Sequence, residues 1–281
     1  APPAAAAPVA AAAAAVDRMS VLKYLGRDDL YEAASELEWQ EDIDRGMALA
    51  TVNPGNCLYS FVSQAWSRNC TGCTLRTVEL IDYEDGFDSF KATAKLLQRG
   101  RAKGGAANPL NPQNFNFKAY TAGLDRLRSE FLASKPPGHE KVNFLTVFHG
   151  TNWSVAKTVV ETGPRPLRST DAGFFGTGSY VSLESFYAGR YARFHDPNPS
   201  TKHFTMILYV AVLGSAYVVT RRRDYDEMDV GPGWSAFFSN DPSKAIAILG
   251  QYDGHFVPVK WIDDEYDYQA CDEGAAEAHE L

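Results

Sequence analysis

The side chains best suited to chemistry lie within residues 147–192, which hold a histidine, several glycines and two well-spaced tyrosines. His149 ends an apolar run and is followed at once by Gly150 and Thr151. An imidazole there can share a hydrogen bond with a sugar hydroxyl, and a glycine lets the backbone approach a ligand closely. The alternative is a histidine whose ring is satisfied by neighbouring backbone at a strand end.

A glycine-spaced aromatic block follows at residues 174–180, and Tyr191 comes eleven positions after Tyr180. The glycines favour a tight turn that presents Tyr180. The block is not a dinucleotide-binding Rossmann loop, because Val181 stands where the third glycine would be. Two tyrosines about three helical turns apart could stack on both sides of a planar ring. Together with a histidine for a ribose, they indicate a nucleotide site and point to NAD, although both could instead be core aromatics.

A third block, at residues 252–257, leads into an acidic stretch at residues 263–269. In an extended conformation Asp263, Glu265 and Asp267 share one face of the strand. A row of acids is usually a solvated strand edge, whereas an acid drawn into a pocket is a candidate for catalysis. Both readings remain open for each acid taken alone.

The elements that must position these residues divide the chain into three parts. Residues 1–15 are almost all Ala and Pro, which predicts a disordered tail. Residues 16–140 predict a mostly helical region, with apolar residues at helical spacing over 21–37, an interruption near Gly26, and further helices at 87–98 and 119–133. An exposed loop is expected at 100–116, and a boundary near the prolines before residue 140.

Strands dominate residues 141–281. They are expected at 142–149, 179–182, 205–219 with a bend or break at Gly214, 255–260 and 265–269. Helices are expected at 153–162, 184–194 and 241–249. The predicted fold class is therefore α+β, a helical N-terminal part followed by a compact mixed sheet with flanking helices.

Composition restricts the partners. The chain has 281 residues, a net charge of −8 and 45% apolar residues, which is ordinary for a globular protein. The acidic balance disfavours nucleic acid and anionic membrane surfaces, with a local basic patch left open at residues 221–223. No apolar run approaches the roughly 20 residues that a membrane-spanning helix needs.

The cysteines do not indicate a metal site. Cys70 and Cys73 form a lone CxxC without the paired spacing of a zinc site, so no metal is expected. In an exported protein, two of Cys57, Cys70 and Cys73 could form a disulfide.

In order and together, the three blocks resemble the histidine–tyrosine–glutamate class of ADP-ribosyltransferases, which includes poly(ADP-ribose) polymerase catalytic domains and diphtheria-type toxins. The resemblance covers residues 142–272. It implies a catalytic domain over residues 141–281 with a mixed, split β-sheet. It also implies transfer of ADP-ribose from NAD to an acceptor, with release of nicotinamide.

For the adenosine side and the carboxamide, the resemblance implies four contacts. His149 would bond the 2′-hydroxyl of the adenosine ribose, with Thr151 assisting. The backbone of Gly150 would hold the nicotinamide carboxamide, and Arg165 would approach the adenosine.

For the reacting side, the resemblance implies that Tyr180 and Tyr191 clamp the nicotinamide ring. Glu265, which is followed by a tyrosine, would be the catalytic glutamate that stabilises the charge on the opening ribose. Asp263, Asp264 and Asp267 compete for that role. Ala188 departs from many polymerase members, which have a serine three residues before the second tyrosine; the toxin branch varies there.

The expected cosubstrate is NAD, and the expected acceptor is a protein that receives a single ADP-ribose. The alternatives are an NAD glycohydrolase and a nonenzymatic module that binds NAD or ADP-ribose. An RNA 2′-phosphotransferase is disfavoured by the acidic charge. The site of action is wherever NAD is available: the cytosol, including that of a host cell if the protein is a secreted toxin or effector.

Overall fold

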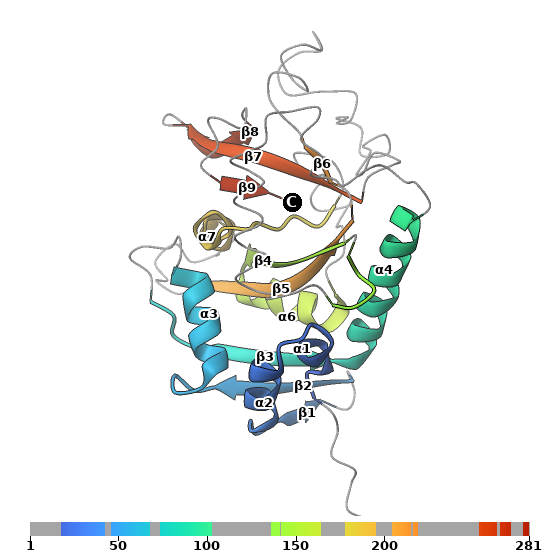
Figure 1. Ribbon diagram of the computed structural model, residues 1–281. Coiled ribbons are helices and arrows are strands. Elements are labelled where there is room, and N and C mark those ends of the chain that lie inside the picture. Colours follow the sequence, from blue (N-terminus) through green and yellow to red (C-terminus); the bar gives the residue numbers. More distant parts are fainter. Residues whose placement is uncertain are drawn as a thin grey trace, which may run out of the picture.

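The computed structural model is a mixed helix and strand protein, which confirms the α+β class (Figure 1). It describes residues 18–42, 46–67, 74–102, 136–140, 142–163, 178–194, 204–214, 216–218, 253–262, 265–270 and 278–280. The expected tail at 1–15 and the expected helices at 119–133 and 241–249 lie outside these residues.

The N-terminal region contains four helices and a small sheet among its described residues. The helices are α1 (Ser20–Tyr24), α2 (Asp28–Ser35), α3 (Cys57–Ser67) and α4 (Glu84–Ala102). Gly26, with a φ of +72°, makes the turn between the first two, as the sequence predicts. Helix α4 continues to Ala102, so the expectation of a loop beginning at residue 100 is wrong by one helical turn.

A three-stranded antiparallel sheet in this region was not expected. It is formed by β1 (Gln40–Asp42), β2 (Met47–Val52) and β3 (Val78–Tyr83), in the order β1-β2-β3. Short apolar runs such as 47–52 do not distinguish a strand from a buried helical turn, and pairing with β3 decides in favour of the strand.

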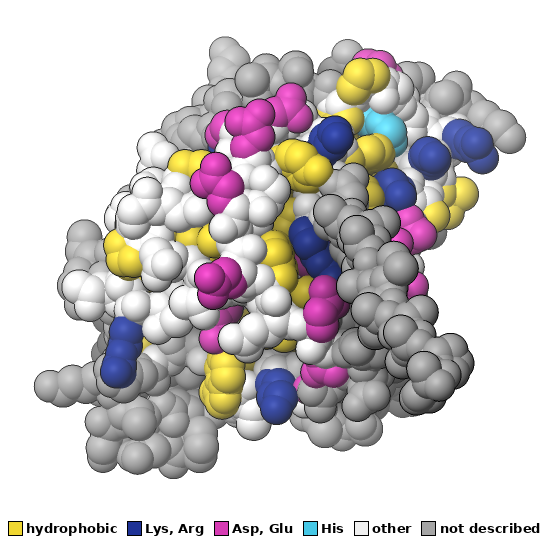
Figure 2. Space-filling view, turned by 90° about the horizontal axis from the view of Figure 1, so that it is seen from below, with side chains coloured by type: hydrophobic (Ala, Val, Ile, Leu, Met, Phe, Trp, Pro, Cys, Tyr) yellow, Lys and Arg dark blue, Asp and Glu magenta, His cyan; other side chains and the backbone are white. Residues whose placement is uncertain are grey.

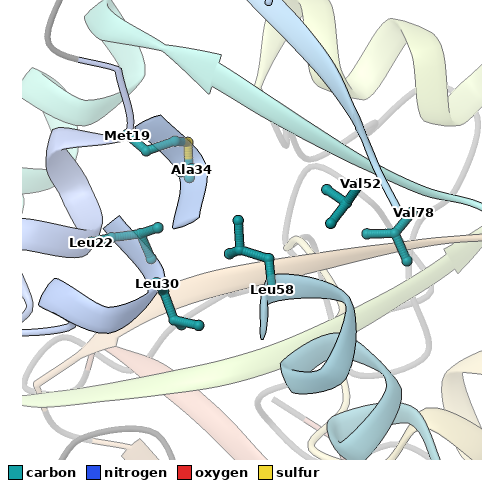
Figure 3. Packing of buried hydrophobic residues seen from close by; sticks show 7 residues of the cluster. All are labelled: Met19, Leu22, Leu30, Ala34, Val52, Leu58 and Val78. Carbon is teal, nitrogen blue, oxygen red and sulfur yellow. The ribbon is translucent and has the colours of Figure 1, made fainter. Parts of the chain in front are cut away.

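The first core lies between these helices and strands. Seven buried side chains meet there (Figure 3). Six come from α1, α2, α3, β2 and β3, and the seventh, Met19, is the residue before α1: Met19, Leu22, Leu30, Ala34, Val52, Leu58 and Val78. Burial of the larger of these side chains, those of Met, Leu and Val, supplies about 1.5–3 kcal/mol each and drives the packing of α1 and α2 over the small sheet.

The second half begins with a long antiparallel pair. Strand β4 (Asn143–Thr151) pairs with β5 (Thr205–Leu213) from Asn143↔Leu213 to Thr151↔Thr205. Helices α6 (Trp153–Thr162) and α7 (Ser185–Phe194) flank the pair. The predicted strands and helices at 142–149, 153–162 and 184–194 are confirmed. The strand predicted at 205–219 breaks at Gly214 as expected, with β5 before the break and a short strand at Ala216–Val218 after it.

A further sheet is built around β7 (Gly254–Ile262). It pairs in parallel with β6 (Ala216–Val218) and antiparallel with β8 (Glu265–Ala270) and β9 (Ala278–Glu280). The strands predicted at 255–260 and 265–269 are confirmed, and β9 was not predicted. In Figure 1 the β4–β5 pair lies between this sheet and the N-terminal one.

The two halves share apolar contacts. Leu25, just after α1, and Ala94 of α4 form one buried cluster with Val142 and Phe144. The hydroxyl of Tyr24 lies 2.7 Å from a ring nitrogen of His139, in the turn before β4. The boundary near residue 140 is therefore crossed by a common core, which fixes β4 against the N-terminal region.

Candidate functional site

His149 lies near the end of β4 and is held by a backbone carbonyl. Its Nδ1 is 2.8 Å from the backbone oxygen of Tyr180. Because a carbonyl oxygen can only accept, Nδ1 must carry the hydrogen of this bond. In the neutral ring Nε2 is then the nitrogen that accepts a hydrogen bond. The structure thus brings together two of the predicted site residues and fixes the tautomer of one.

The segment that carries Tyr180 runs along β4, on the edge that β5 does not occupy. Phe148 N–H donates to Ser182 O at 2.7 Å, and Ser182 N–H donates to Phe148 O at 2.8 Å. Hydrogen-bonding direction alternates along a strand, so the N–H and C=O of Gly150 face the same edge as those of Phe148. The site therefore presents one backbone donor and one acceptor beside the Tyr180 segment.

Gly150 also allows α7 to lie directly on β4. A β-carbon built on Gly150 would overlap the backbone oxygen of Ala188 and lie 2.9 Å from the backbone nitrogen of Ala192. Both alanines are buried, and Ala188 packs with Phe148 in a small apolar cluster. Ala188 therefore serves packing between α7 and β4.

Tyr191 is positioned by another tyrosine one helical turn earlier. The hydroxyls of Tyr187 and Tyr191 are 3.0 Å apart, and their rings meet edge to face with centroids 5.4 Å apart. Tyr187 is buried, whereas Tyr191 and Tyr180 are each partly exposed. Sequence reasoning missed Tyr187, although its spacing of four from Tyr191 places both on one helix face.

Thr151 is the last residue of β4 and is buried. The next residue, Asn152, ends the strand by capping α6, because its side-chain oxygen accepts from the backbone N–H of Val155 at 2.9 Å. The chain therefore turns into a helix immediately after the His149–Thr151 segment, which keeps that segment short and fixed.

Tyr209 is a further polar residue that the sequence did not single out. It pairs with Val147 in the β4–β5 ladder, so it lies on the same sheet face as His149. Its hydroxyl is buried without a hydrogen-bond partner, and burial raises the pKa of the phenol. Tyr209 thus places a buried, neutral hydroxyl on the sheet face that carries His149.

Two further predicted site residues are the catalytic acid, Glu265, and the adenosine contact, Arg165. Glu265 is the first residue of β8, and its backbone lies opposite Ile262 of β7. It thus belongs to the sheet built on β7, whereas His149 belongs to the β4–β5 pair. Arg165, Asp263 and Asp264 lie outside the described residues.

The described part of the chain contains no group of three His, Cys, Asp or Glu side chains that could hold a metal ion. Within the same residues, no helix is long and apolar enough to cross a membrane. Cys57, at the start of α3, is exposed and has a free thiol. On the side of the molecule seen in Figure 2, the described acidic and basic side chains are interspersed, and they form no continuous basic surface.

No known family model matches this chain, and neither does any curated protein.

Proposed function

We propose that this protein is an NAD-dependent ADP-ribosyltransferase of the histidine–tyrosine–glutamate class. The observation that carries the proposal is the 2.8 Å contact between His149 Nδ1 and the Tyr180 backbone oxygen. It makes Nε2, on the side of the ring away from the Tyr180 oxygen, the nitrogen that accepts, and a ribose hydroxyl can donate to it.

The backbone at Gly150 suits a carboxamide. A nicotinamide carboxamide has both a donor and an acceptor, and the Gly150 C=O and N–H provide the complementary pair at the strand edge. Tyr180 and Tyr191 are partly exposed, one on the adjoining segment and one on the helix that packs on Gly150. In this proposal their rings enclose the nicotinamide by stacking.

The chemistry assigned to Glu265 is charge stabilisation. The bond between the ribose C1′ and the nicotinamide nitrogen breaks, and its electron pair leaves with neutral nicotinamide. The ribose develops oxocarbenium character, which a fixed carboxylate stabilises more in the transition state than in the ground state. The acceptor then attacks C1′ and loses a proton.

The arrangement of the second half is compatible with this class. Two small sheets carry the proposed residues, with His149 in the β4–β5 pair and Glu265 in the sheet around β7. The start of β7 adjoins the end of β5, since a β-carbon at Gly254 would lie 3.3 Å from a methyl carbon of Leu213. We therefore extend the proposal to a split-sheet catalytic domain over residues 141–281.

We assign a protein as the acceptor and a single ADP-ribose as the modification. The net charge of −8 weighs against a nucleic-acid acceptor. NAD is the cosubstrate, and the reaction takes place where NAD is present, in the cytosol of the producing cell or of a host cell.

The test is to incubate the chain with labelled NAD and a cell lysate, and to follow nicotinamide release and labelled products by mass spectrometry. Glu265→Gln should abolish transfer while NAD still binds; Glu79→Gln, on β3 of the N-terminal sheet, is the control and should retain activity. Full activity in Glu265→Gln would remove that residue from the role.

The products distinguish the alternatives. NAD binding without nicotinamide release identifies a binding module. Release of free ADP-ribose, with no labelled protein, identifies a glycohydrolase.

A further inference from the structure

The end of α3 meets the beginning of α7, although the two helices belong to opposite halves of the chain. The Ser185 hydroxyl donates to the backbone oxygen of Trp66 at 2.8 Å, and the two residues are only 1% and 8% exposed. Trp66 is the next-to-last residue of α3, where helix carbonyls lack an intrahelical partner. Ser185 supplies that partner from the first position of α7.

Apolar contacts reinforce this junction. Ala65 of α3 lies in one buried cluster with Phe148 of β4 and Ala188 of α7. The Trp66 ring is 5.8 Å from that of Phe204, and a β-carbon on Gly189 of α7 would lie 3.7 Å from Phe204. Trp66 therefore supports Phe204, which in turn lies against α7.

The contact surface of α7 explains why a polar anchor is useful. The helix approaches β4 and β5 through small residues, namely Ala188, Gly189 and Ala192. Small residues allow a close approach, but they interlock little with their neighbours. These three residues therefore fix the position of the helix along its own axis only weakly. Besides the buried Tyr187 ring, the Ser185 bond at the first residue of α7 is suited to fix it.

We propose that the end of α3 sets the position of α7, and that Ser185 is a positioning residue for the Tyr191 side of the nicotinamide site. The N-terminal region then takes part in the site without contacting the ligand. The inference rests on the proposed function for the identity of that ligand, whereas the seating of α7 is independent of it.

The main variant is Ser185→Ala. Loss of the buried hydrogen bond should weaken NAD binding by about tenfold and raise KM more than it lowers kcat. Amide hydrogen exchange in α7 should become faster, since its first turn loses its anchor. Ser185→Thr keeps the hydroxyl and should restore both properties. If the added methyl group prevents folding, Ser185→Cys retains the size with a weaker donor and should give an intermediate result.

The matched control is Ala34→Gly in α2. It removes a buried methyl group from the cluster in Figure 3, so it lowers stability without touching α7. Its NAD affinity and α7 exchange should equal those of the wild type. Equal weakening of NAD binding in the two variants, at equal loss of Tm, would show general destabilisation and overturn the inference, as would unchanged α7 exchange in Ser185→Ala.

The exchange measurement needs no ligand, so the two proposals can fail separately. A wild-type protein that does not bind NAD refutes the proposed function. Faster α7 exchange in Ser185→Ala would still support the seating of the helix.

Discussion

His149 and Tyr180 are 31 positions apart and are joined by a bond from the imidazole Nδ1 to a backbone oxygen, 2.8 Å long. The bond uses the main chain of Tyr180 and not its phenol ring. It also orients the imidazole, because a ring held through Nδ1 presents Nε2 in the opposite direction. One bond thus couples the strand end to the aromatic segment in a defined geometry.

Substitution of His149 should separate ligand binding from stability. In His149→Asn, the side-chain amide can still donate to the Tyr180 oxygen, but the acceptor at Nε2 is lost. NAD affinity should fall about tenfold, the value of one hydrogen bond, with little change in stability. His149→Ala should lose the same affinity and also about 1 kcal/mol of stability, since the Tyr180 carbonyl loses its partner. Calorimetric titration with NAD and urea unfolding measure the two effects; unchanged affinity in both variants would contradict the assignment.

Gly150 should not tolerate a methyl group. A β-carbon there overlaps the backbone oxygen of Ala188, and backbone cannot move aside as a flexible side chain can. Gly150→Ala should cost about 1–3 kcal/mol by overpacking and should weaken NAD binding as α7 is displaced. Gly55→Ala is the control, because nothing lies within 4 Å of its β-carbon position. Urea unfolding measures the stability of both variants. If Gly150→Ala were as stable as Gly55→Ala, α7 would not lie on β4 as described.

Much of the second half could be predicted from the sequence, because its signals are local. The apolar run before His149 predicts β4, and helix α6 begins at the residue after its asparagine cap. The bonds Ser185–Trp66 and His149–Tyr180 could not be predicted, since they join segments that only the tertiary fold brings together. The sheet at β1–β3 was missed for the same reason, because its short strands gain their identity from pairing.

Tyr209 should make the protein sensitive to alkaline pH. Burial raises the pKa of its phenol above the ordinary value of 10.0, so the folded state favours the neutral form. This preference contributes to the free energy of unfolding. The contribution is fully present below about pH 10 and is lost as the pH rises through the raised folded pKa. In Tyr209→Phe, the loss of unfolding free energy at alkaline pH should therefore be smaller.

The same variant also tests the burial of the Tyr209 hydroxyl. Near neutral pH Tyr209→Phe should be as stable as the wild type or up to about 1 kcal/mol more stable, because the buried hydroxyl has no hydrogen-bond partner. Urea midpoints between pH 7 and 11 test both statements; a variant clearly less stable at pH 7 would indicate that the hydroxyl is satisfied.

Tyr187 should affect the site through Tyr191 alone. Tyr187→Phe keeps the buried ring and its edge-to-face contact but removes the hydroxyl that lies 3.0 Å from that of Tyr191. Stability should fall by about 0.5–1.5 kcal/mol, as expected for one hydrogen bond. NAD affinity should fall several-fold, because the Tyr191 ring becomes freer to rotate before the ligand binds. Tyr191→Phe breaks the same hydroxyl pair from the other side, so it is the matched comparison. Similar losses in both variants would assign the effect to the pair, whereas a loss confined to Tyr191→Phe would mean that the Tyr191 hydroxyl contacts the ligand itself and that Tyr187 is only a packing residue.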